Sequence, residues 1–242
     1  RYAGLAAQQA AQQSGVDAAP GPGSPPRGGA GEAAARRAEL LQIAAACDQV
    51  AAGAPRDLHE ALQLYWACWS LMVLEVGCLV SMGRIDQVLA PYWPEDPAQQ
   101  EPAQELVDCF VVKCNDMEAL WRGNSLINNE PVLSGLTRAG QDGTNPVTWA
   151  MLRSVGRLNL PDPQPAVRLH DHSPPALVEE VCRLWLAGRS QVAAYNDDVF
   201  VPALEGAGMA PADARDYAID ACQDVTIFGK SDFYLAGSVD LA

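Results

Sequence analysis

The second half of the chain alternates short apolar runs with helical patterns, and this alternation limits the possible folds most. Strands that alternate with helices usually belong to a parallel sheet, in which the helices form the crossover connections. The sequence therefore predicts an α/β fold with parallel strands. The predicted strands are residues 132–137, 166–170 and 192–195, and the predicted helices among them are 145–158, 174–187 and 197–206.

The first half of the chain has helical patterns only, interrupted by a segment rich in proline and glycine. This segment, residues 14–31, is predicted to be a flexible linker or surface insert. We expect Asp57 to cap one helix, with Glu60 three residues later completing a capping box. The helices predicted are residues 1–13, 32–50, 57–76, 86–92 and 102–123, with a further one at 211–219.

Composition excludes several classes of function. The formal net charge of −14 disfavours a surface for nucleic acid or anionic membrane, since both need clustered Lys and Arg. The longest apolar stretch, residues 62–80, contains Gln63, Ser70 and Glu75, so it predicts a buried helix and no membrane span. Seven irregularly spaced cysteines indicate reduced thiols of a cytosolic protein. No Cys-x-x-Cys pair or zinc-type histidine spacing occurs, so no metal site is predicted.

Three polar motifs have structural interpretations that we favour over catalytic ones. Arg84 and Asp86 fit ion pairs in a connection between helices. Arg168 and His170 share one side of a strand, where a histidine is more often a hydrogen-bonded core residue than an acid or base. Residues 195–198 join a strand to a helix, and their side chains are expected to cap that helix.

Cys222 and Asp224 form the candidate reactive pair. In an extended segment, residues i and i+2 point to the same side, so the thiol and the carboxylate would enter one cavity together. The flanking acids Asp220 and Asp224 raise a thiol pKa, which disfavours thiolate chemistry. The remaining possibilities are hydrogen-atom transfer by the thiol, or a cysteine that is merely a small buried hydrophobe.

The order of several motifs resembles that of the glycyl radical enzymes, the family of pyruvate formate-lyase and the glycerol, diol and choline-cleaving lyases. The resemblance covers nearly the whole chain apart from the proline- and glycine-rich insert. The matching runs are residues 1–3, 59–63, 83–87 with 91–92, 168–170, 196–198, and 213–224 with 229–230.

The resemblance implies a fold and a site. The fold would be part of a ten-stranded α/β barrel, a half-barrel with packed helices, and residues 1–242 would be a portion of the catalytic domain. Cys222 would become a thiyl radical on a central loop, and Asp224 would act as the base. Cys78 and Leu79 stand where polyol dehydratases have a His-Ser pair, so with Phe228 they would form a less polar substrate wall, unsuited to glycerol.

The chain also departs from the family pattern. Ala221 replaces the glycine before the cysteine, and Asp224 replaces a glutamate, which moves the base by about 1 Å. A His-Asp pair of the dehydratases is missing near Leu235. The loop that carries the radical glycine is not among the 242 residues. We therefore expect a fragment of a longer catalytic chain, inactive alone and prone to self-association through exposed strand edges.

The resemblance also implies cofactors and partners. No cofactor would be bound directly; a glycyl radical on a residue outside this chain would be installed by a radical-SAM activating enzyme carrying a 4Fe–4S cluster. The partners would be a small-molecule substrate, that enzyme, the rest of the catalytic polypeptide and a second copy in a homodimer, with neither nucleic acid nor membrane. The location would be the cytoplasm or a bacterial microcompartment.

Two alternative functions remain at this point. A non-catalytic, truncated relative could serve as a structural or interaction module, as the altered Ala221–Asp224 run would allow. An ordinary α/β hydrolase or transferase is disfavoured because the chain has neither a Gly-x-Ser-x-Gly motif nor a phosphate-binding glycine loop.

Overall fold

The computed structural model describes residues 30–76, 81–120, 130–189, 191–220, 224–227 and 229–231. The chain divides into two compact units, residues 1–65 and 66–242. The predicted helix at 1–13 and almost all of the insert at 14–31 lie outside the described residues. Within the described part, no helix has the length and apolar character that crossing a membrane requires.

The first unit contains α2 (Ala30–Ala52) and the beginning of α3 (Leu58–Val76), close to their predicted bounds. Asp57 caps α3 as predicted, because its Oδ1 accepts the backbone N–H of Glu60 at 2.9 Å. The Glu60 carboxylate accepts the backbone N–H of Arg56 at 2.8 Å and pairs with the Arg56 guanidinium. The arginine thus takes the carboxylate that a capping box would direct to Asp57.

In the second unit, the rest of α3 is followed, among the described residues before the sheet, by α4 (Ile85–Leu89), the 3₁₀ turn η1 (Ala90–Tyr92) and α5 (Pro97–Leu120). Helix α5 begins five residues before its predicted start at Pro102. The side chain of Asp96 accepts the N–H of Ala98 at 3.0 Å, and Pro97 occupies the first helical position. This arrangement is a usual helix start, and Pro102 then lies inside the helix.

The predicted parallel sheet is confirmed. Strands β1 (Val132–Ser134), β2 (Ala166–Leu169) and β3 (Ala193–Asn196) lie in that order and are all parallel. Helices α6 (Pro146–Leu158) and α7 (Pro175–Leu186) form the crossovers between them. Asn145 caps α6 by accepting the N–H of Val147 at 2.9 Å, which explains why this helix keeps its predicted bounds.

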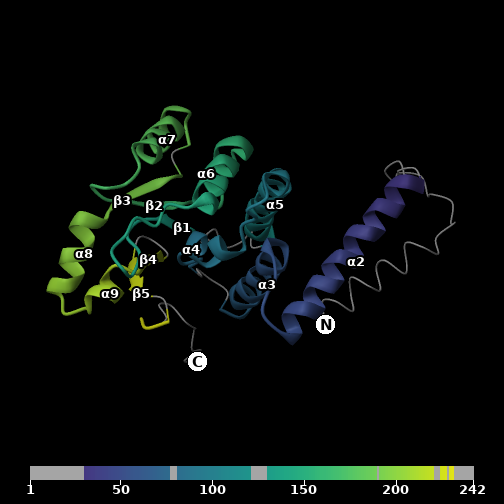
Figure 1. Ribbon diagram of the computed structural model, residues 1–242, viewed down its shortest axis with the longest axis horizontal. Coiled ribbons are helices and arrows are strands. Elements are labelled where there is room, and N and C mark those ends of the chain that lie inside the picture. The colour runs from purple at the N-terminus through teal and green to yellow at the C-terminus, as the bar shows by residue number, and fades with distance from the viewer. Residues whose placement is uncertain are drawn as a thin grey trace, which may run out of the picture. The chain divides into compact units, whose positions relative to one another are not determined.

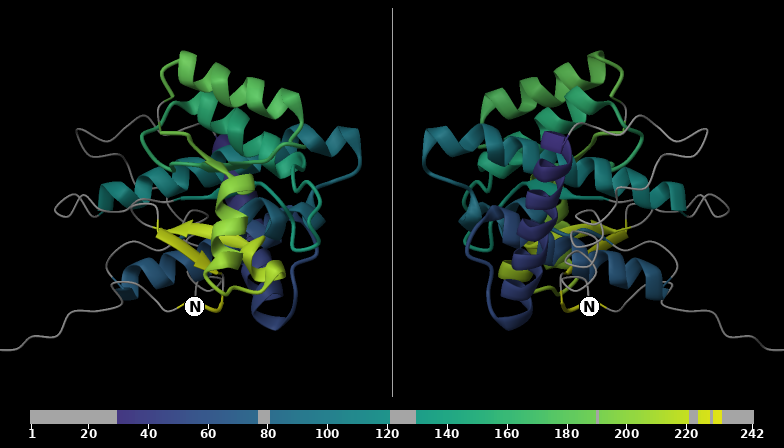
Figure 2. Two further views of the ribbon diagram at one scale, coloured as in Figure 1. Left: turned by 90° about the vertical axis from the view of Figure 1, so that its left-hand side faces the viewer. Right: turned by 90° about the vertical axis from the view of Figure 1, so that its right-hand side faces the viewer.

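The two faces of the sheet have different coverings. Register pairs Val132 with Ala166, so these residues share one face, while Leu133 and Val167 share the other. The first face belongs to a core cluster that includes Ile219 from a later hairpin. Helices α6 and α7 lie on the opposite side of the sheet from this hairpin (Figures 1 and 2).

After β3 the chain forms α8 (Asp197–Gly206), α9 (Pro211–Ala214) and the antiparallel hairpin of β4 (Tyr217–Asp220) and β5 (Asp224–Ile227). The predicted helix at 211–219 is therefore wrong beyond residue 214. Tyr217, Ala218 and Ile219 are fully buried and pair with β5. Cross-strand pairing and burial outweigh the local helical pattern, as tertiary context commonly does.

Strand β1 ends earlier than the predicted 132–137 because the backbone turns at Ser134 and Gly135, with φ of 61° and 78°. At Gly135 a Cβ atom would lie 2.6 Å from Arg168 Cβ and 2.8 Å from Asp197 Oδ2. Glycine is required here both for its left-handed conformation and for the close approach of two buried charged side chains.

Candidate active site

The candidate site is centred on the β4–β5 hairpin. Residues 221–223 connect its strands, so predicted Cys222 lies outside the described residues, as do predicted Cys78, Leu79 and Phe228. Of the predicted site residues, Asp224 is the one that the structure describes. It is exposed and is the first residue of β5.

Two carboxylates lie at the two ends of the connection that contains Cys222. Asp220, the last residue of β4, pairs directly with Asp224 across the hairpin. Like charges directly opposite each other in an antiparallel pair repel. The hairpin therefore places the two acids that flank residues 221–223 opposite each other.

Ser81 attaches the chain before α4 to the hairpin. Its hydroxyl donates to the Ile219 carbonyl at 2.8 Å and accepts the Gly83 N–H at 3.0 Å. Ser81 directly follows residues 77–80, which contain Cys78 and Leu79, and Ile219 precedes Cys222 by three residues. The contact joins the chain that flanks the predicted substrate wall to the chain that flanks the predicted reactive cysteine.

A fully buried ion pair positions the start of β4. Arg168 on β2 donates two parallel hydrogen bonds to Asp197, Nε to Oδ1 at 2.9 Å and Nη2 to Oδ2 at 2.8 Å. Arg168 also donates to the Tyr217 carbonyl at 2.8 Å, and its guanidinium lies 3.8 Å from the centre of the Tyr217 ring. The Tyr217 hydroxyl donates to Asp197 Oδ1 at 2.8 Å. Arg168 therefore has a structural role beneath the hairpin.

The cap predicted at the start of α8 is confirmed, but the role of the neighbouring aspartate was missed. Asn196 accepts the N–H of Asp198 at 2.9 Å, as a cap does. Asp197 instead turns inward, and besides Arg168 it accepts the Leu136 N–H at 2.6 Å. Nothing in the sequence of residues 196–198 indicates that Asn196 caps the helix while Asp197 is buried.

Arg84 and Asp86 are structural, as predicted, although each binds other segments. Arg84 pairs with Asp216 at 3.0 Å and donates to the Ser134 carbonyl at 2.9 Å. Burial lowers the pKa of Arg84, and the nearby charge of Arg168 lowers it further. Asp86 accepts the Ser134 N–H at 2.6 Å. The two residues thus connect the start of α4 to the end of β1 and the turn before β4.

His170 is a buried, hydrogen-bonded residue, in agreement with the structural interpretation. Its Nε2 lies 3.1 Å from Asp142 Oδ1, and its backbone N–H donates to Ser173 Oγ at 2.9 Å. It borders a cavity of about 270 Å³ at the ends of β2 and β3. The cavity is lined by Leu169, His170, Asp171, Ala194, Tyr195, Asn196 and Asp198.

Glu130 is a candidate functional residue that the sequence analysis missed. It lies two residues before Val132, and the residue is 7% exposed. Burial raises the pKa of the Glu130 carboxyl to about 7, with further increases from Asp220, Asp162 and Asp224. The sequence offered one signal, a glutamate just before an apolar strand. The aspartates that act on Glu130 are distant in sequence, so the sequence does not indicate that they are near it.

Two of the described acids near the hairpin lie in unlike environments. Asp224 is exposed, whereas burial raises the pKa of the Glu130 carboxyl to about 7. Pairs of acids in such unlike environments are how proteins assign base and acid roles. In the described part of the chain, no three or more His, Cys, Asp or Glu side chains are arranged to hold a metal ion.

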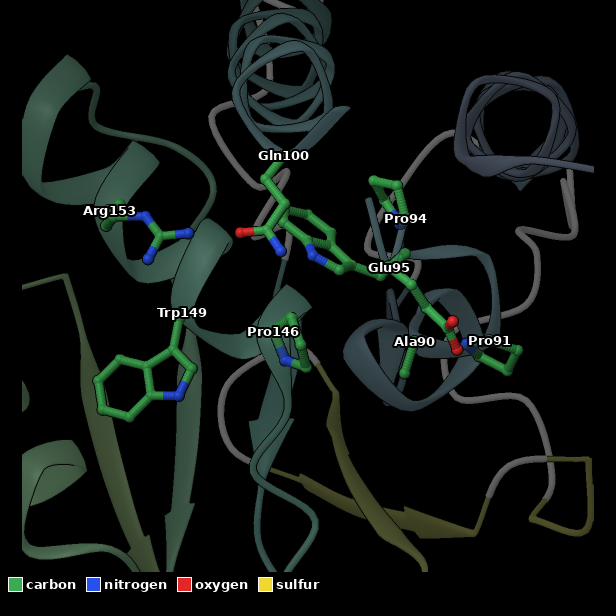
Figure 3. Close-up of a pocket in the computed structure, with 9 residues that line it drawn as sticks. Ala90, Pro91, Pro94, Glu95, Gln100, Pro146, Trp149 and Arg153 are labelled. Carbon is green, nitrogen blue, oxygen red and sulfur yellow. The ribbon is translucent and has the colours of Figure 1, made fainter. Parts of the chain in front are cut away.

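A second cavity lies apart from these residues. It has a volume of about 580 Å³ and is formed by η1, the start of α5 and α6 (Figure 3). Asp224, the predicted site residue that the structure describes, does not line it, and the ionisable groups among its described lining residues are Glu95 and Arg153. Arg153 donates to Gln104 at 2.9 Å, so it is already engaged in joining α6 to α5. The lining residues are Ala90, Pro91, Trp93, Pro94, Glu95, Gln100, Pro146, Trp149 and Arg153.

Comparison with known proteins identifies relatives along most of the chain. A family model described as pyruvate formate lyase-like matches residues 30–242. Trans-4-hydroxy-L-proline dehydratase of Clostridioides difficile is 28% identical over 221 residues, covering 86% of this chain and 28% of that protein. (2S)-3-sulfopropanediol dehydratase of Klebsiella oxytoca is 30% identical over 208 residues, covering 81% of this chain and 25% of that protein. The chain thus spans about a quarter of the length of these curated relatives.

Solved structures agree with this similarity. The glycerol-bound B12-independent glycerol dehydratase from Clostridium butyricum matches with a TM-score of 0.81 at 30% identity, over 96% of this chain and 28% of that one. A glycyl radical enzyme from Archaeoglobus fulgidus matches with a TM-score of 0.77 at 29% identity, over 95% of this chain and 29% of that one. The fold described above is therefore part of the α/β barrel of such enzymes.

Proposed function

This chain belongs to the pyruvate formate lyase-like family of glycyl radical enzymes, and we propose that it is the core of a radical lyase or dehydratase that cleaves a C–X bond. In this proposal residues 1–242 are a portion of the catalytic domain, with residues 14–31 as a flexible insert. The relatives that carry the proposal are dehydratases, and the substrate of this protein is proposed to be other than glycerol.

The proposed reaction begins at Cys222. Its thiyl radical removes a hydrogen atom from a substrate carbon that bears a hydroxyl, so an S–H bond forms and a C–H bond breaks. Asp224 takes the hydroxyl proton, and the adjacent C–X bond breaks with its electron pair leaving on X. X leaves with the proton that Asp224 took, so the Asp224 carboxylate is regenerated. The substrate radical becomes a carbonyl radical, and that radical recovers its hydrogen atom from the Cys222 thiol. Substrate is thereby converted to a carbonyl compound and HX.

The hairpin is the observation that carries this proposal. Strand β4 is buried in the same core cluster as Val132 and Ala166 of the parallel sheet, and β5 returns beside it with Asp224 as its first residue. Such a hairpin would deliver a cysteine in its connection together with a carboxylate two residues later. The acids beside Cys222 disfavour a thiolate, which suits a thiol that exchanges hydrogen atoms.

We also assign the remaining parts of the site by proposal. Cys78, Leu79 and Phe228 form the substrate wall, and the contact between Ser81 and Ile219 supports a common location for their segments and the hairpin. The glycyl radical resides on a residue outside this chain and is installed by a radical-SAM activating enzyme. The enzyme acts as a homodimer in the cytoplasm or in a bacterial microcompartment.

Electron paramagnetic resonance tests the proposal. The full-length protein, activated anaerobically by its radical-SAM enzyme, should give a glycyl doublet. Cys222→Ala should keep the doublet and lose all turnover, because the radical forms without Cys222 but cannot reach substrate. A known relative activated in parallel controls for the procedure. If the relative gave a doublet and this protein gave none, the proposal would fail and a non-catalytic module would be the better description.

A further inference from the structure

An ion pair joins the two ends of the chain at the base of the β4–β5 hairpin. Asp213 lies in α9, shortly before β4 begins, and Lys230 lies shortly after β5 ends. The Lys230 ammonium donates to Asp213 Oδ2 at 2.6 Å. The first cross-strand pair of the hairpin is Tyr217 with Ile227. The ion pair, which we call the basal ion pair, therefore lies just outside the first pair of the hairpin.

The basal ion pair continues into a longer chain of charges. Arg138, in the turn between β1 and α6, donates to Asp213 Oδ1 and to Asp216 Oδ2, both at 2.9 Å. Asp216 also accepts from the buried Arg84 at 3.0 Å. The charges alternate in sign from Lys230 to Arg84. They connect both ends of the hairpin to the β1–α6 turn and to the residue before α4.

A hydrogen-bonded turn after β5 presents Lys230 to its partner. The Lys230 N–H donates to the Ile227 carbonyl at 2.9 Å, and the Ile227 N–H donates to Ser231 Oγ at 2.7 Å. Gly229 has a φ of 72°, a left-handed conformation that glycine adopts without steric cost. Because the backbone here is already ordered, less conformational entropy is lost when Lys230 binds Asp213.

We propose that the basal ion pair holds the base of the hairpin together, and that Lys230 is thereby a positioning residue for Asp224 and Cys222. The inference rests on the proposed function, because it gives Lys230 a part in the reaction at the hairpin. Lys230 acts through the backbone and does not contact the reacting groups. It lies at the base of the hairpin, whereas the connection at residues 221–223 lies at the opposite end.

The basal ion pair should affect position more than stability. Exposed ion pairs stabilise proteins only slightly, and the side chains of Lys230 and Arg138 are 58% and 53% exposed. A displacement of about 1 Å at reacting groups can nevertheless lower a reaction rate by about 10²-fold. Hydrogen bonds from Lys230 and Arg138 hold the pKa of Asp213 below its usual range, so its carboxylate stays ionised at neutral pH. Loss of Lys230 should therefore loosen the hairpin and leave the rest of the fold intact.

Hydrogen exchange in the full-length protein, before activation, tests this inference. Mass spectrometry measures the exchange rates of the backbone amides in β4 and β5, with β2 as the internal reference. Lys230→Ala should raise the hairpin rates by about threefold or more, because loss of an ion pair within a network eases local opening. The rates in β2 should not change, and the melting temperature should shift by less than about 3 °C.

Two further variants isolate the charge of Lys230. Lys230→Arg keeps a positive charge at the position and should return the hairpin rates to within about twofold of those of the unmodified protein. Lys113→Ala removes the other lysine of the chain, which is exposed on α5, and is the matched control. It should change neither the hairpin rates nor the rates in β2.

The alkylation rate of Cys222 reports whether the effect reaches the proposed reactive residue. Iodoacetamide forms an S–C bond with the cysteine and releases iodide and a proton. Peptide mass spectrometry separates Cys222 from Cys182, an exposed cysteine on α7. Lys230→Ala should raise the rate at Cys222 by about threefold or more and leave that at Cys182 unchanged. Lys230→Arg should reverse the effect.

Ionic strength provides a measurement that needs no variant. Raising it from about 0.05 to about 0.5 M shortens the Debye length from about 14 to about 4 Å, which screens the exposed Lys230 and Arg138. The hairpin rates of the unmodified protein should rise by about twofold or more relative to those of β2. If Lys230→Ala does not fold, this measurement decides.

Several results would overturn the inference. Unchanged hairpin exchange or unchanged Cys222 alkylation in a folded Lys230→Ala variant would remove the positioning role. An equal rise in the hairpin and in β2 would show that Lys230 supports the whole fold and not the hairpin in particular. Hairpin rates that do not respond to salt in the unmodified protein would also count against it.

This inference and the proposed function fail separately, because none of these measurements needs a radical. A protein in which Lys230→Ala loosens the hairpin but which gives no glycyl doublet would refute the radical function and retain the basal ion pair. A protein that gives the doublet and whose hairpin is unaffected by Lys230→Ala would keep the radical function and lose the positioning role.

Discussion

Arg168 and Asp197 are joined by two parallel hydrogen bonds of 2.9 and 2.8 Å, and neither side chain is exposed to solvent. The pair links β2 to the start of α8, and Arg168 also holds the carbonyls of Arg215 and Tyr217 where β4 begins. The position of the hairpin that carries the candidate site therefore depends on a buried charge pair.

Loss of one partner of this pair should be costly. Asp197→Asn leaves the Arg168 guanidinium buried without its counter-charge, and we expect the free energy of unfolding to fall by about 3–5 kcal/mol. Chemical denaturation of the full-length protein measures the loss. Glu205→Gln, on the exposed side of α8, is the control and should change stability by less than about 0.5 kcal/mol. Equal effects of the two substitutions would show that the pair contributes little.

Gly135 should not tolerate a side chain. Gly135→Ala would force a Cβ to within 2.6 Å of Arg168 and place alanine at φ +78°. We expect destabilisation of more than about 2 kcal/mol from the clash and the backbone strain together. Gly206→Ala, at the end of α8 with no atom within 4 Å of its Cβ, should be close to neutral. The difference between the two melting temperatures measures the effect.

Replacement of Ser81 should lower both the stability of the protein and the turnover of the activated enzyme. Ser81→Ala removes the hydrogen bond to the Ile219 carbonyl, which we expect to cost about 1 kcal/mol of folding free energy. Because Ile219 lies in the strand that leads to Cys222, turnover of the activated enzyme should fall by more than the folded fraction does. Ser81→Thr retains a hydroxyl and should restore part of both. If turnover fell only in proportion to the folded fraction, Ser81 would have no role in the site beyond stability.

Asp224 is expected to be the base. Asp224→Asn removes the proton acceptor while keeping side-chain size, and should lower kcat by about 10²-fold or more. The glycyl doublet should be unchanged, because the radical forms elsewhere. Asp224→Glu restores a carboxylate and should recover activity in part. Full turnover by the asparagine variant would show that another group takes the proton.

Glu130 should make stability depend on pH. Its folded pKa of about 7 exceeds the ordinary value of 4.5, so between these pH values the folded state binds more protons than the unfolded state. Stability should therefore fall as pH rises from about 4.5 to 7 and level off above, a change of about 2 kcal/mol after allowance for solvent screening. Denaturation at pH 5 and pH 7.5 measures the change. Glu130→Gln should remove it, whereas Glu179→Gln should leave it intact.

Local sequence signals predicted much of the architecture. Asn145 with Pro146 defines the start of α6, and Asn196 defines the start of α8, because the cap uses atoms within three residues of the helix end. The alternation of apolar runs and helices predicted that β1, β2 and β3 are parallel, as they are. The motifs around Gly83–Gln87 and Cys222 indicated the family, which the comparisons confirmed.

The amino-acid sequence by itself thus determined the fold class, the family and most helix ends, because each depends on short patterns along the chain. Only the tertiary structure decided the β4–β5 hairpin, since Tyr217–Asp220 has a helical pattern that pairing with β5 overrides. The tertiary structure also decided the pKa of Glu130, which depends on burial and on nearby aspartates. These aspartates follow Glu130 by 32 positions (Asp162) to 94 positions (Asp224) in the chain. Electrostatic environments of this kind arise from distance in space, which a one-dimensional pattern does not contain.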